Sequence, residues 1–384
     1  MRFLAALHSR EFGAIAEFKR RSPSAGDLRP RGDVAAVARA YEEAGAAAMS
    51  VLVDERFGGS LDDLRAARAA TKLPILGKGF FSEELDLLKL KTAGADAALI
   101  ILRDVDDERA RALMTHAREI GLETLVEAHD ADELARAIDL GAPVIGINAR
   151  DLGTFEIDRR RQLELVSRAP QDRIVVAESG VHTRAQGAAA ELAGASAILV
   201  GTALMRATDP AAKLEELISR PLVKVCGLTR QEDVDVAVEA GADLVGFILA
   251  AETTRRAPGV LDVPAEVLSV AVFVEDRHET PADLVQLYRR ENGHRSKDAV
   301  LLRDDIEVAC VVDQPWKSHD PLHYQRAAAS EGRVMLAGAL SPENVRDAIL
   351  AARPWAVDAS SSLETAPGVK DPDRVHAFVE AARC

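Results

Sequence analysis

The chain is poor in aromatic residues, in cysteines and in long apolar runs, and each shortage excludes a class of protein. Aromatic residues make up 4% of the 384 residues, against 48% hydrophobic residues in all. Alanine-rich helices over aliphatic strands therefore fit the composition better than an aromatic-rich β-sandwich. Cys226, Cys310 and Cys384 are too few and too scattered for a disulfide framework or a zinc cluster. Because no run of about 18 apolar residues occurs and Met1 leads into a charged segment, we expect a cytosolic protein without a membrane span or signal peptide.

The sequence also lacks an excess of positive charge. Its formal net charge is −14, whereas a grip along a nucleic-acid backbone needs a basic face. Single phosphorylated metabolites remain candidate ligands, because backbone N–H groups at helix starts hold phosphate without net positive charge. His319 and His323 are four residues apart and could share a helix face, but no third ligand lies nearby. We therefore expect neither nucleic-acid binding nor a metal site.

The length exceeds the roughly 100 to 200 residues of a usual domain, so two domains are expected. Through the first half, short apolar runs alternate with amphipathic stretches. Such runs predict a parallel sheet covered on both faces, and eight of them are the number that closes a (β/α)₈ barrel. The predicted strands are residues 15–18, 48–52, 74–76, 97–101, 123–126, 143–147, 173–177 and 195–200.

Helical patterns lie between these runs, often begun by an Asp, Ser or Thr cap and mostly closed by a glycine. The predicted helices are residues 34–44, 82–93, 106–120, 130–140 and 183–193, followed by Gly45, Gly94, Gly121, Gly141 and Gly194.

Polar residues gather at the carboxyl ends of the predicted strands. Glu17 and Lys19 occupy alternate positions, so a strand would point both charges to one side, just before a Ser-Pro-Ser-Ala-Gly turn. Charges placed in this way suit an anionic substrate that must be gripped and protonated. Lys78, Glu127, Asn148 and Glu178 have a similar placement, and in this kind of barrel those ends form the active site. A shared placement favours catalysis over solvated loop charges or helix caps.

These residues also carry a family resemblance. The segments IAEFKRRSPSAGDL, PILGKGFF, LVEAH, GINARDL, VAESGV and ILVGTALM, in this order across residues 15–205, resemble the strand-end motifs of indole-3-glycerol phosphate synthase. The resemblance implies that Lys78 is the general acid of ring closure and that Glu127 is the acid/base of the dehydration. It implies a substrate shell of Glu17, Lys19, Asn148, Arg150, Glu178 and Ser179, and we expect the phosphate at Ser22, Gly180, Gly201 and Thr202.

Two expectations concern the surroundings of these residues. Crowding Lys19 and Lys78 into one site should lower the pKa of each and make each a better proton donor, while Glu17 and Glu178 orient them. The family commonly has an aspartate where Gly79 stands, so one orienting carboxylate is missing. Family members also carry one or two helices ahead of the first strand. Here only residues 1–12 precede it, which would leave the barrel mouth less covered.

A second domain is expected to begin near residues 219–221, with a strand over residues 222–225. The segments VKVCGLTRQEDVDVAVEAGADLVGFIL, TTRRAP, AVFV, AGALSPENV and VDASSSLETAPGVKDP resemble phosphoribosylanthranilate isomerase over most of residues 222–384. By this resemblance Cys226, which could otherwise be a buried structural cysteine, is the general base of an Amadori rearrangement, and Asp313 is the general acid. Arg255 would pair with the anthranilate carboxylate. The phosphate would lie at Gly338, Ala339, Ser360 and Ser361.

The second half departs further from its family. Between Val274 and Val334 we predict strands only at residues 299–302 and 308–312, one too few for a full barrel. Arg303-Asp304 stands where the family has a histidine-glycine pair after the fourth strand, and QPWKSHDP replaces a glycine-rich loop. An incomplete barrel should disturb the geometry between Cys226 and Asp313.

The sequence thus predicts an α/β protein of two tandem (β/α)₈ barrels, the second incomplete. Residues 1–219 would be a synthase barrel and residues 220–384 an isomerase-like barrel. The leading hypothesis is a fused enzyme of tryptophan biosynthesis that acts on small phosphorylated anthranilate-derived substrates and needs no metal or cofactor. One alternative keeps an active synthase beside a non-catalytic, structural or interaction domain. Another is a barrel for a different sugar phosphate, such as an epimerase. The oligomeric state is not fixed, and a monomer is compatible with the sequence.

Overall fold

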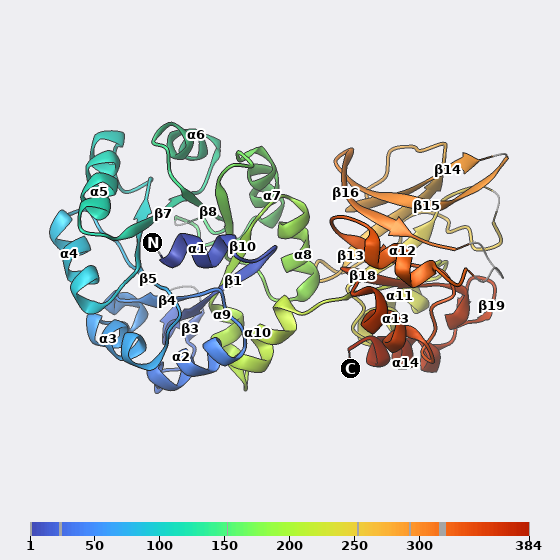
Figure 1. The fold of residues 1–384 in the computed structure, drawn as a ribbon, viewed down its shortest axis with the longest axis horizontal. Helices are drawn as coiled ribbons and strands as arrows, with labels where there is room; N and C mark the ends of the chain where they lie inside the picture. The colour runs from blue at the N-terminus through green and yellow to red at the C-terminus, as the bar shows by residue number, and fades with distance from the viewer. Residues whose placement is uncertain are drawn as a thin grey trace. The chain divides into compact units, whose positions relative to one another are not determined.

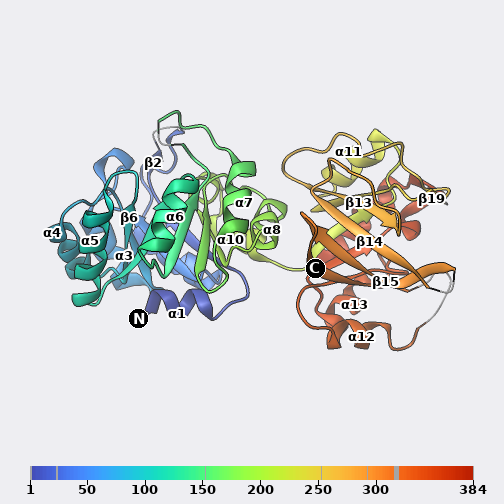
Figure 2. The same cartoon turned by 90° about the horizontal axis from the view of Figure 1, so that it is seen from above.

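The computed structural model describes residues 2–22, 25–151, 153–251, 253–291, 293–314 and 320–383, so His319 and Cys384 lie outside the described residues. The chain divides into two compact units (Figures 1 and 2). The first comprises Met1–His182 and Gly187–Ile218, and the second comprises Thr183–Gln186 and Ser219–Cys384. In the described part of the chain, no helix is long and apolar enough to cross a membrane.

The first unit is a closed barrel of eight parallel strands in the order β1-β10-β9-β8-β7-β6-β5-β4. Nearly every strand residue is buried, as expected when helices cover the outside of the sheet and side chains fill the inside. All eight strands predicted for this half are confirmed, with ends within two residues of those expected. They are β1 (Gly13–Phe18), β4 (Ala48–Leu52), β5 (Ile75–Lys78), β6 (Ala97–Ile101), β7 (Glu123–Ala128), β8 (Val144–Asn148), β9 (Ile174–Glu178) and β10 (Ala197–Val200).

Helices surround these strands (Figure 1). The five predicted helices are confirmed to within two residues at each end, and the five glycines expected to close them all have positive φ. Asp33, Asp106 and Asp130 cap helices by accepting a hydrogen bond from a first-turn N–H. The helices are α1 (Arg2–His8), α2 (Val34–Glu43), η1 (Glu55–Phe57), α3 (Leu61–Ala70), α4 (Glu84–Ala93), α5 (Asp107–Glu119), α6 (Ala131–Asp139), α7 (Arg159–Arg168), α8 (Arg184–Leu192), α9 (Thr202–Arg206) and α10 (Pro210–Ile218).

Helix α1 covers the end of the barrel at which the strands begin. Phe3 and Leu7 are buried in one apolar cluster with inward-facing strand residues such as Leu125. The N–H groups of Phe3 and Leu4 donate to the two carboxylate oxygens of Glu123, at 2.8 and 3.1 Å, which places a negative charge at the helix N-terminus. Because Glu123 opens β7, α1 lies at the opposite end from the predicted catalytic residues. At that other end, a small hairpin of β2 (Arg21–Ser22) and β3 (Gly26–Asp27) follows β1.

The second unit is also a closed barrel of eight strands, so the prediction that it lacks a strand is wrong. The missing strand is β14, whose buried residues Leu284, Gln286 and Tyr288 alternate with more exposed ones. The barrel runs β11 (Leu222–Cys226), β12 (Leu244–Ile248), β13 (Leu268–Val274), β14 (Leu284–Glu291), β15 (His294–Arg303), β16 (Ile306–Val312), β17 (Val334–Leu336) and β18 (Ala356–Ala359), and a small sheet of β19 (Glu364–Ala366) and β20 (Val369–Lys370) follows.

Hairpins replace helical crossovers in this barrel, which is why eight strands fit into fewer residues. Strand β15 runs antiparallel to both β14 and β16. A hairpin turn needs about two residues, whereas a crossover between parallel strands needs a dozen or more. Asp304 and Asp305, both at positive φ, form the turn between β15 and β16, as a tight hairpin turn requires.

The helices of the second unit gather on one side of it in Figure 1, and β14, β15 and β16 lie on the other side. These helices are α11 (Gln231–Glu239), α12 (His323–Ala329), α13 (Val345–Ala352), η2 (Ser361–Leu363) and α14 (Pro372–Arg383). Their apolar residues, including Val234, Val345 and Phe378, form one buried cluster with the strands beneath them.

Candidate active sites

A cavity of about 640 Å³ opens at the carboxyl ends of the strands in the first unit. Its lining includes most of the residues that the sequence singled out. Glu178 lies beneath the floor, fully buried, and reaches the site through Lys78. The predicted residues in the lining are Glu17, Lys19, Ser22, Lys78, Glu127, Asn148, Arg150, Ser179, Gly180, Gly201 and Thr202.

The Lys78 ammonium lies among three carboxylates that come from three other strands. Its Nζ is 3.8 Å from Oε2 of Glu17 on β1 and 3.5 Å from Oε2 of Glu127 on β7, and it donates a hydrogen bond to Glu178 on β9. The Lys19 ammonium lies 2.8 Å from Oε1 of Glu17. Both lysines therefore contact the same carboxylate, so they face the same end of the barrel.

The carboxylates reverse the expected effect on the pKa of Lys78. Burial alone would lower this pKa, but Glu178, Glu127 and Glu17 together outweigh it and raise the pKa above its usual value. The expectation that crowded lysines would make Lys78 a stronger acid is therefore wrong for the free site. The sign depends on how many carboxylates surround the lysine in space, which the sequence pattern does not show.

Glu127 and Glu178 have pKa values pushed in opposite directions. Burial raises the pKa of Glu178 to about 8, and the charge of Glu127 adds to this effect while Lys78 opposes it. Burial also acts against the ionised form of Glu127, but Lys78 and His129 hold the pKa of Glu127 well below its usual range. The two carboxyl groups therefore differ in acidity, and the more acidic one is Glu127, which lies beside His129.

Two glycines leave space for the carboxylates of Glu17 and Glu178. A Cβ built on Gly146 of β8 would lie 2.1 Å from Oε1 of Glu178, and one on Gly201 would lie 2.3 Å from Oε1 of Glu17. Neither distance is possible for a real side chain. The positions of both carboxylates thus depend on the absence of a side chain on the neighbouring strand or turn.

The sequence analysis missed an aromatic wall of the cavity and one buried histidine. Phe57 and Phe80 stack with ring centroids 6.4 Å apart, and the Arg56 guanidinium lies 3.9 Å from the centre of the Phe80 ring. His129 lies directly behind Glu127. Only its position two residues after Glu127 in LVEAH could have indicated this contact.

The second unit brings Cys226 and Asp313 to the two ends of one hydrogen-bond chain. Lys224 lies two residues before Cys226 on β11, where its ammonium interacts with the thiol and donates to Asp358 at 2.9 Å and to Gln286 at 2.5 Å. The amide of Gln286 donates to the Tyr288 hydroxyl at 2.7 Å. That hydroxyl in turn donates to Oδ2 of Asp313 at 2.8 Å.

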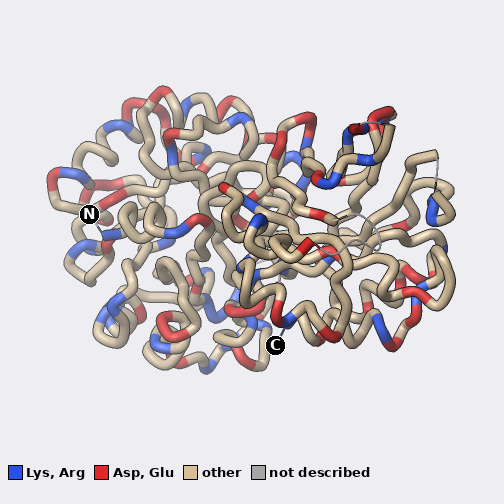
Figure 3. Tube along the Cα trace, turned by 45° about the vertical axis from the view of Figure 1, so that its right-hand side comes forward, with Lys and Arg blue, Asp and Glu red and all other residues tan. Residues whose placement is uncertain are grey.

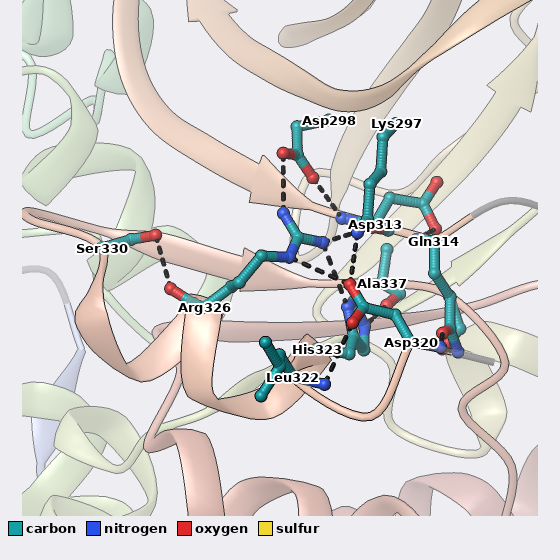
Figure 4. Close-up of polar contacts among 11 residues, drawn as sticks. Lys297, Asp298, Asp313, Gln314, Asp320, Leu322, His323, Arg326, Ser330 and Ala337 are labelled. Carbon is teal, nitrogen blue, oxygen red and sulfur yellow. Dashed lines mark hydrogen bonds and ion pairs between the residues drawn. The ribbon is translucent and has the colours of Figure 1, made fainter.

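Two arginines fix Asp313 from either side. The Arg295 guanidinium is 3.0 Å from the Asp313 carboxylate and lies over the Tyr288 ring at 4.0 Å. Arg326 of α12 donates to the main-chain carbonyl of Asp313 at 3.0 Å and to Asp298 at 2.9 Å. Asp298 accepts the Asp313 N–H at 3.1 Å, which closes a ring of hydrogen bonds around this residue (Figure 4). The expected disturbance from a missing strand does not arise, because no strand is missing.

The inward position on the fourth strand of this barrel belongs to Tyr288 of β14. Arg303 and Asp304 instead lie at the turn between β15 and β16, at the end of the barrel where the parallel strands begin. The interpretation that they replace the family's histidine-glycine pair is therefore wrong. The apolar pattern places the fourth strand at β15, because β14 alternates buried and more exposed residues.

Of the remaining predicted residues of this half, Arg255 and Ser360 lie beside Gly227, the residue after Cys226. Nε of Arg255 contacts both carboxylate oxygens of Glu364, at 3.0 and 2.9 Å, so a substrate carboxylate would compete with Glu364. Burial raises the pKa of the Cys226 thiol, although Lys224 acts against this effect. The remaining candidates are Gly338 (φ 85°) and Ala339 (φ 55°) after β17, and Ser360 and Ser361 after β18.

Comparisons with known proteins agree with both sets of motifs. The family described as indole-3-glycerol phosphate synthase matches residues 1–217, and the family described as N-(5'phosphoribosyl)anthranilate (PRA) isomerase matches residues 320–381. Indole-3-glycerol phosphate synthase of Leifsonia xyli subsp. xyli is 49% identical over 53% of this chain and 78% of its own length.

Longer relatives align with both halves. Multifunctional tryptophan biosynthesis proteins of Schizosaccharomyces pombe and Phycomyces blakesleeanus are each 31% identical over 96% of this chain, which spans 59% and 62% of their lengths. Among solved structures, phosphoribosyl anthranilate isomerase from Thermus thermophilus covers 42% of this chain and 97% of its own, with 26% identity and a TM-score of 0.35. The chain belongs to the indole-3-glycerol phosphate synthase family, and its residues 320–381 match the N-(5'phosphoribosyl)anthranilate (PRA) isomerase family.

Proposed function

We propose that residues 1–219 convert 1-(2-carboxyphenylamino)-1-deoxyribulose 5-phosphate into indole-3-glycerol phosphate, with loss of CO₂ and water. The observation that carries this proposal is the Lys78 ammonium among Glu17, Glu127 and Glu178 at the floor of the cavity. Ring closure needs a proton delivered to a carbonyl while a ring carbon attacks it, and the later steps need a base beside a cation. The cluster supplies both.

In this mechanism Lys78 is the general acid of ring closure, and Glu127 is the acid/base of the dehydration. The carboxylates of Glu17, Glu127 and Glu178 hold Lys78 protonated before the substrate arrives. A substrate carbonyl that replaces one of these carboxylates at the ammonium weakens that hold, and proton transfer becomes easier. Glu127 is ionised in the free site, so it enters the dehydration as the proton acceptor. Lys19, oriented by Glu17, adds a second cation on the same side of the cavity.

The cavity lining supports a position for each part of this substrate. The wall of Phe57 and Phe80 offers a flat apolar surface to the anilino ring. Asn148 at the end of β8, Arg150 just after it and Ser179 are available to the carboxylate and the ribulose hydroxyls. The phosphate would lie at the turns after β9 and β10 and at β2, where Ser22, Gly180, Gly201 and Thr202 line the wall.

A direct assay tests the synthase proposal. Purified protein is mixed with the carboxyphenylamino-deoxyribulose phosphate, and the indole product is followed by fluorescence. We expect product from the wild type and almost none from Lys78→Ala. Lys72→Ala is the matched control, because Lys72 is exposed and precedes the same strand at its opposite end. No product from the wild type, or equal turnover by Lys78→Ala, would overturn the assignment.

For residues 220–384 we propose the isomerisation of N-(5-phosphoribosyl)anthranilate, with Cys226 as base and Asp313 as acid. The chain of hydrogen bonds from Lys224 to Asp313 and the ring around the Asp313 peptide support a catalytic centre over a structural remnant. Arg255 would bind the anthranilate carboxylate. The phosphate would lie at Gly338, Ala339, Ser360 and Ser361, and the buried Ser360 hydroxyl has no hydrogen-bond partner among the described residues.

Cysteine substitutions separate an active isomerase from a non-catalytic domain. Cys226→Ala should abolish turnover of phosphoribosylanthranilate while the synthase activity stays intact. Cys310→Ala is the control. Cys310 is half-buried on β16, whereas its neighbour Ala309 is buried, so the two side chains lie on opposite faces of the strand. An isomerase rate that Cys226→Ala leaves unchanged, or no turnover by the wild type, would favour the non-catalytic domain.

The wider setting follows from the same chemistry. Both reactions need only proton transfer and electrostatic stabilisation, so we propose no cofactor. The proposed ligands are the small phosphorylated anthranilate derivatives, and a cytosolic location stays a prediction. Figure 3 shows Lys and Arg interspersed with Asp and Glu along the trace, and the absence of nucleic-acid binding likewise stays a prediction.

A further inference from the structure

His129 is a buried histidine between two carboxylates, outside the cavity lining. It follows β7 directly, and only 2% of its side chain is exposed. Its Nε2 lies 3.2 Å from Oε1 of Glu127, and its Nδ1 lies 3.0 Å from Oε2 of Glu133 on α6. The residue therefore links the proposed acid/base of the synthase to the start of a helix on the outside of the barrel.

The start of α6 fixes the orientation of Glu133, and through it the imidazole. Asp130 caps the helix by accepting the Glu133 N–H at 2.9 Å, and Glu133 reaches back to accept the His129 N–H at 2.8 Å. This reciprocal pairing is a variant of the capping box. Nδ1 is hydrogen-bonded to Glu133, whereas Nε2 lies at ion-pair distance from Glu127 and makes no hydrogen bond among the described residues. An imidazolium would place its positive charge between the two carboxylates, with a proton on each ring nitrogen.

The site has one more buried carboxylate than it has ammonium groups. Three buried carboxylates, those of Glu17, Glu127 and Glu178, meet two ammonium groups, those of Lys19 and Lys78. A buried charge without a partner is costly, so one carboxylate must take up a proton or find another cation. Glu127 is the carboxylate of this group that contacts His129.

We propose that His129 is a positioning residue of the synthase reaction: as an imidazolium it keeps Glu127 ionised and turned toward Lys78. The inference rests on the proposed synthase function for its catalytic meaning. The protonation state of His129 itself can be measured without any activity.

The surroundings of His129 favour the imidazolium. Burial would lower its pKa, but Glu127 and Glu133 outweigh this effect and raise the pKa to about 9. Asp104, after β6, and Asp151, after β8, are further acidic groups that interact with His129. Arg103 is the opposing charge, and it lies 3.6 Å from Glu133. His129 should therefore be charged at neutral pH and should lose its proton only as the pH rises through about 9.

The first test measures this protonation state directly. Protein with isotope-labelled histidine is titrated by NMR, and the His129 resonance is assigned by its loss in His129→Asn. We expect titration near pH 9 in the wild type. In Glu133→Gln the midpoint should fall by about one pH unit or more, because one of the two carboxylates loses its charge. A His129 midpoint at or below the ordinary value of about 6.5 would overturn the proposal.

The second test asks whether that charge serves catalysis. In His129→Asn we expect kcat to fall about 10-fold or more at pH 7 and the acidic limb of kcat/KM to move to higher pH, with KM nearly unchanged. His116→Asn, on α5 away from the cavity, is the control and should behave as the wild type. An unchanged pH profile in His129→Asn would refute the positioning role even if the NMR midpoint is high. Absence of synthase activity in the wild type would refute the proposed function instead, and the NMR result would still decide the charge of His129.

Discussion

Replacing Gly146 by alanine should damage the synthase site more than the fold. Gly146 lies in β8, between β7 and β9, and an added Cβ would lie 2.1 Å from Oε1 of Glu178 and 2.6 Å from Cδ2 of Leu125. Ordinary contact begins at 3.4 Å, so the carboxylate oxygen would have to retreat by 1.3 Å. Glu178 is fully buried and holds the Lys78 ammonium, and its displacement would carry the general acid with it.

The size of the effect follows from this displacement. A misplacement of about 1 Å in a catalytic array can cost about 100-fold in rate. Overpacking a filled interior typically costs about 1–3 kcal/mol of unfolding free energy. We therefore expect Gly146→Ala to stay folded, to lose about 1–3 kcal/mol in urea denaturation, and to lose about 100-fold in kcat/KM.

Gly187→Ala is the matched control. Gly187 lies in α8, where an added Cβ has no neighbour closer than 3.7 Å, and alanine is the better helix former by about 1 kcal/mol. The control should keep full synthase activity and should not lose stability. If Gly146→Ala retained the wild-type kcat/KM, the position of Glu178 would not matter for catalysis, and the proposed role of the cluster would be refuted.

Three further outcomes follow from the structure. Tyr288→Phe removes the hydroxyl that donates to Asp313, so isomerase kcat should fall about 10-fold while synthase turnover stays constant, and an unchanged isomerase rate would contradict the role of this contact. Arg326→Met opens the hydrogen-bond ring around the Asp313 peptide, so isomerase kcat should fall without loss of synthase activity in parallel assays; equal isomerase rates would show that the ring does not position Asp313. The raised pKa of His129, about 9, stabilises the fold below pH 6.5, and this contribution is lost as the pH rises through about 9. Urea denaturation should show that loss in the wild type and not in His129→Asn, and equal pH dependence of the two proteins would argue against it.

The first barrel could be predicted almost completely from sequence because its signals are local and repeated. Each strand is a short apolar run, most of the expected helices end at a glycine, and a polar residue such as Lys78 or Glu127 marks a carboxyl end. Once eight such units close into a barrel, the carboxyl ends of the strands lie at one rim, regardless of the conformation of the loops. The shared contact of Lys19 and Lys78 with Glu17 follows from this topology.

The second barrel was harder to predict because its irregular part depends on pairing between strands. Strand β14 alternates buried and exposed residues, and two of the buried ones, Gln286 and Tyr288, are polar and face the site. The period of two and the Asn-Gly pair after Glu291 were available as hairpin signals. These signals point to antiparallel strands, whereas a (β/α)₈ barrel is expected to have parallel strands joined by helices.

Electrostatic properties were the least predictable. The sequence predicts that Lys19 and Lys78 lie at one site, but the direction of a pKa shift depends on every charge within a few ångströms. The carboxylates of Glu17, Glu127 and Glu178 reverse the effect expected for Lys78. The sequence does not indicate the environment of His129 for the same reason, since its partner Glu133 comes from a helix that the pattern places on the outside of the barrel.

The most direct test of two working barrels in one chain supplies N-(5-phosphoribosyl)anthranilate alone to the purified protein and follows indole-3-glycerol phosphate. The wild type should form this product. Cys226→Ala should form it only when the carboxyphenylamino-deoxyribulose phosphate is added, and Lys78→Ala should accumulate that intermediate. Consumption of neither compound by the wild type, or full product formation by both variants, would contradict the proposed catalytic sites.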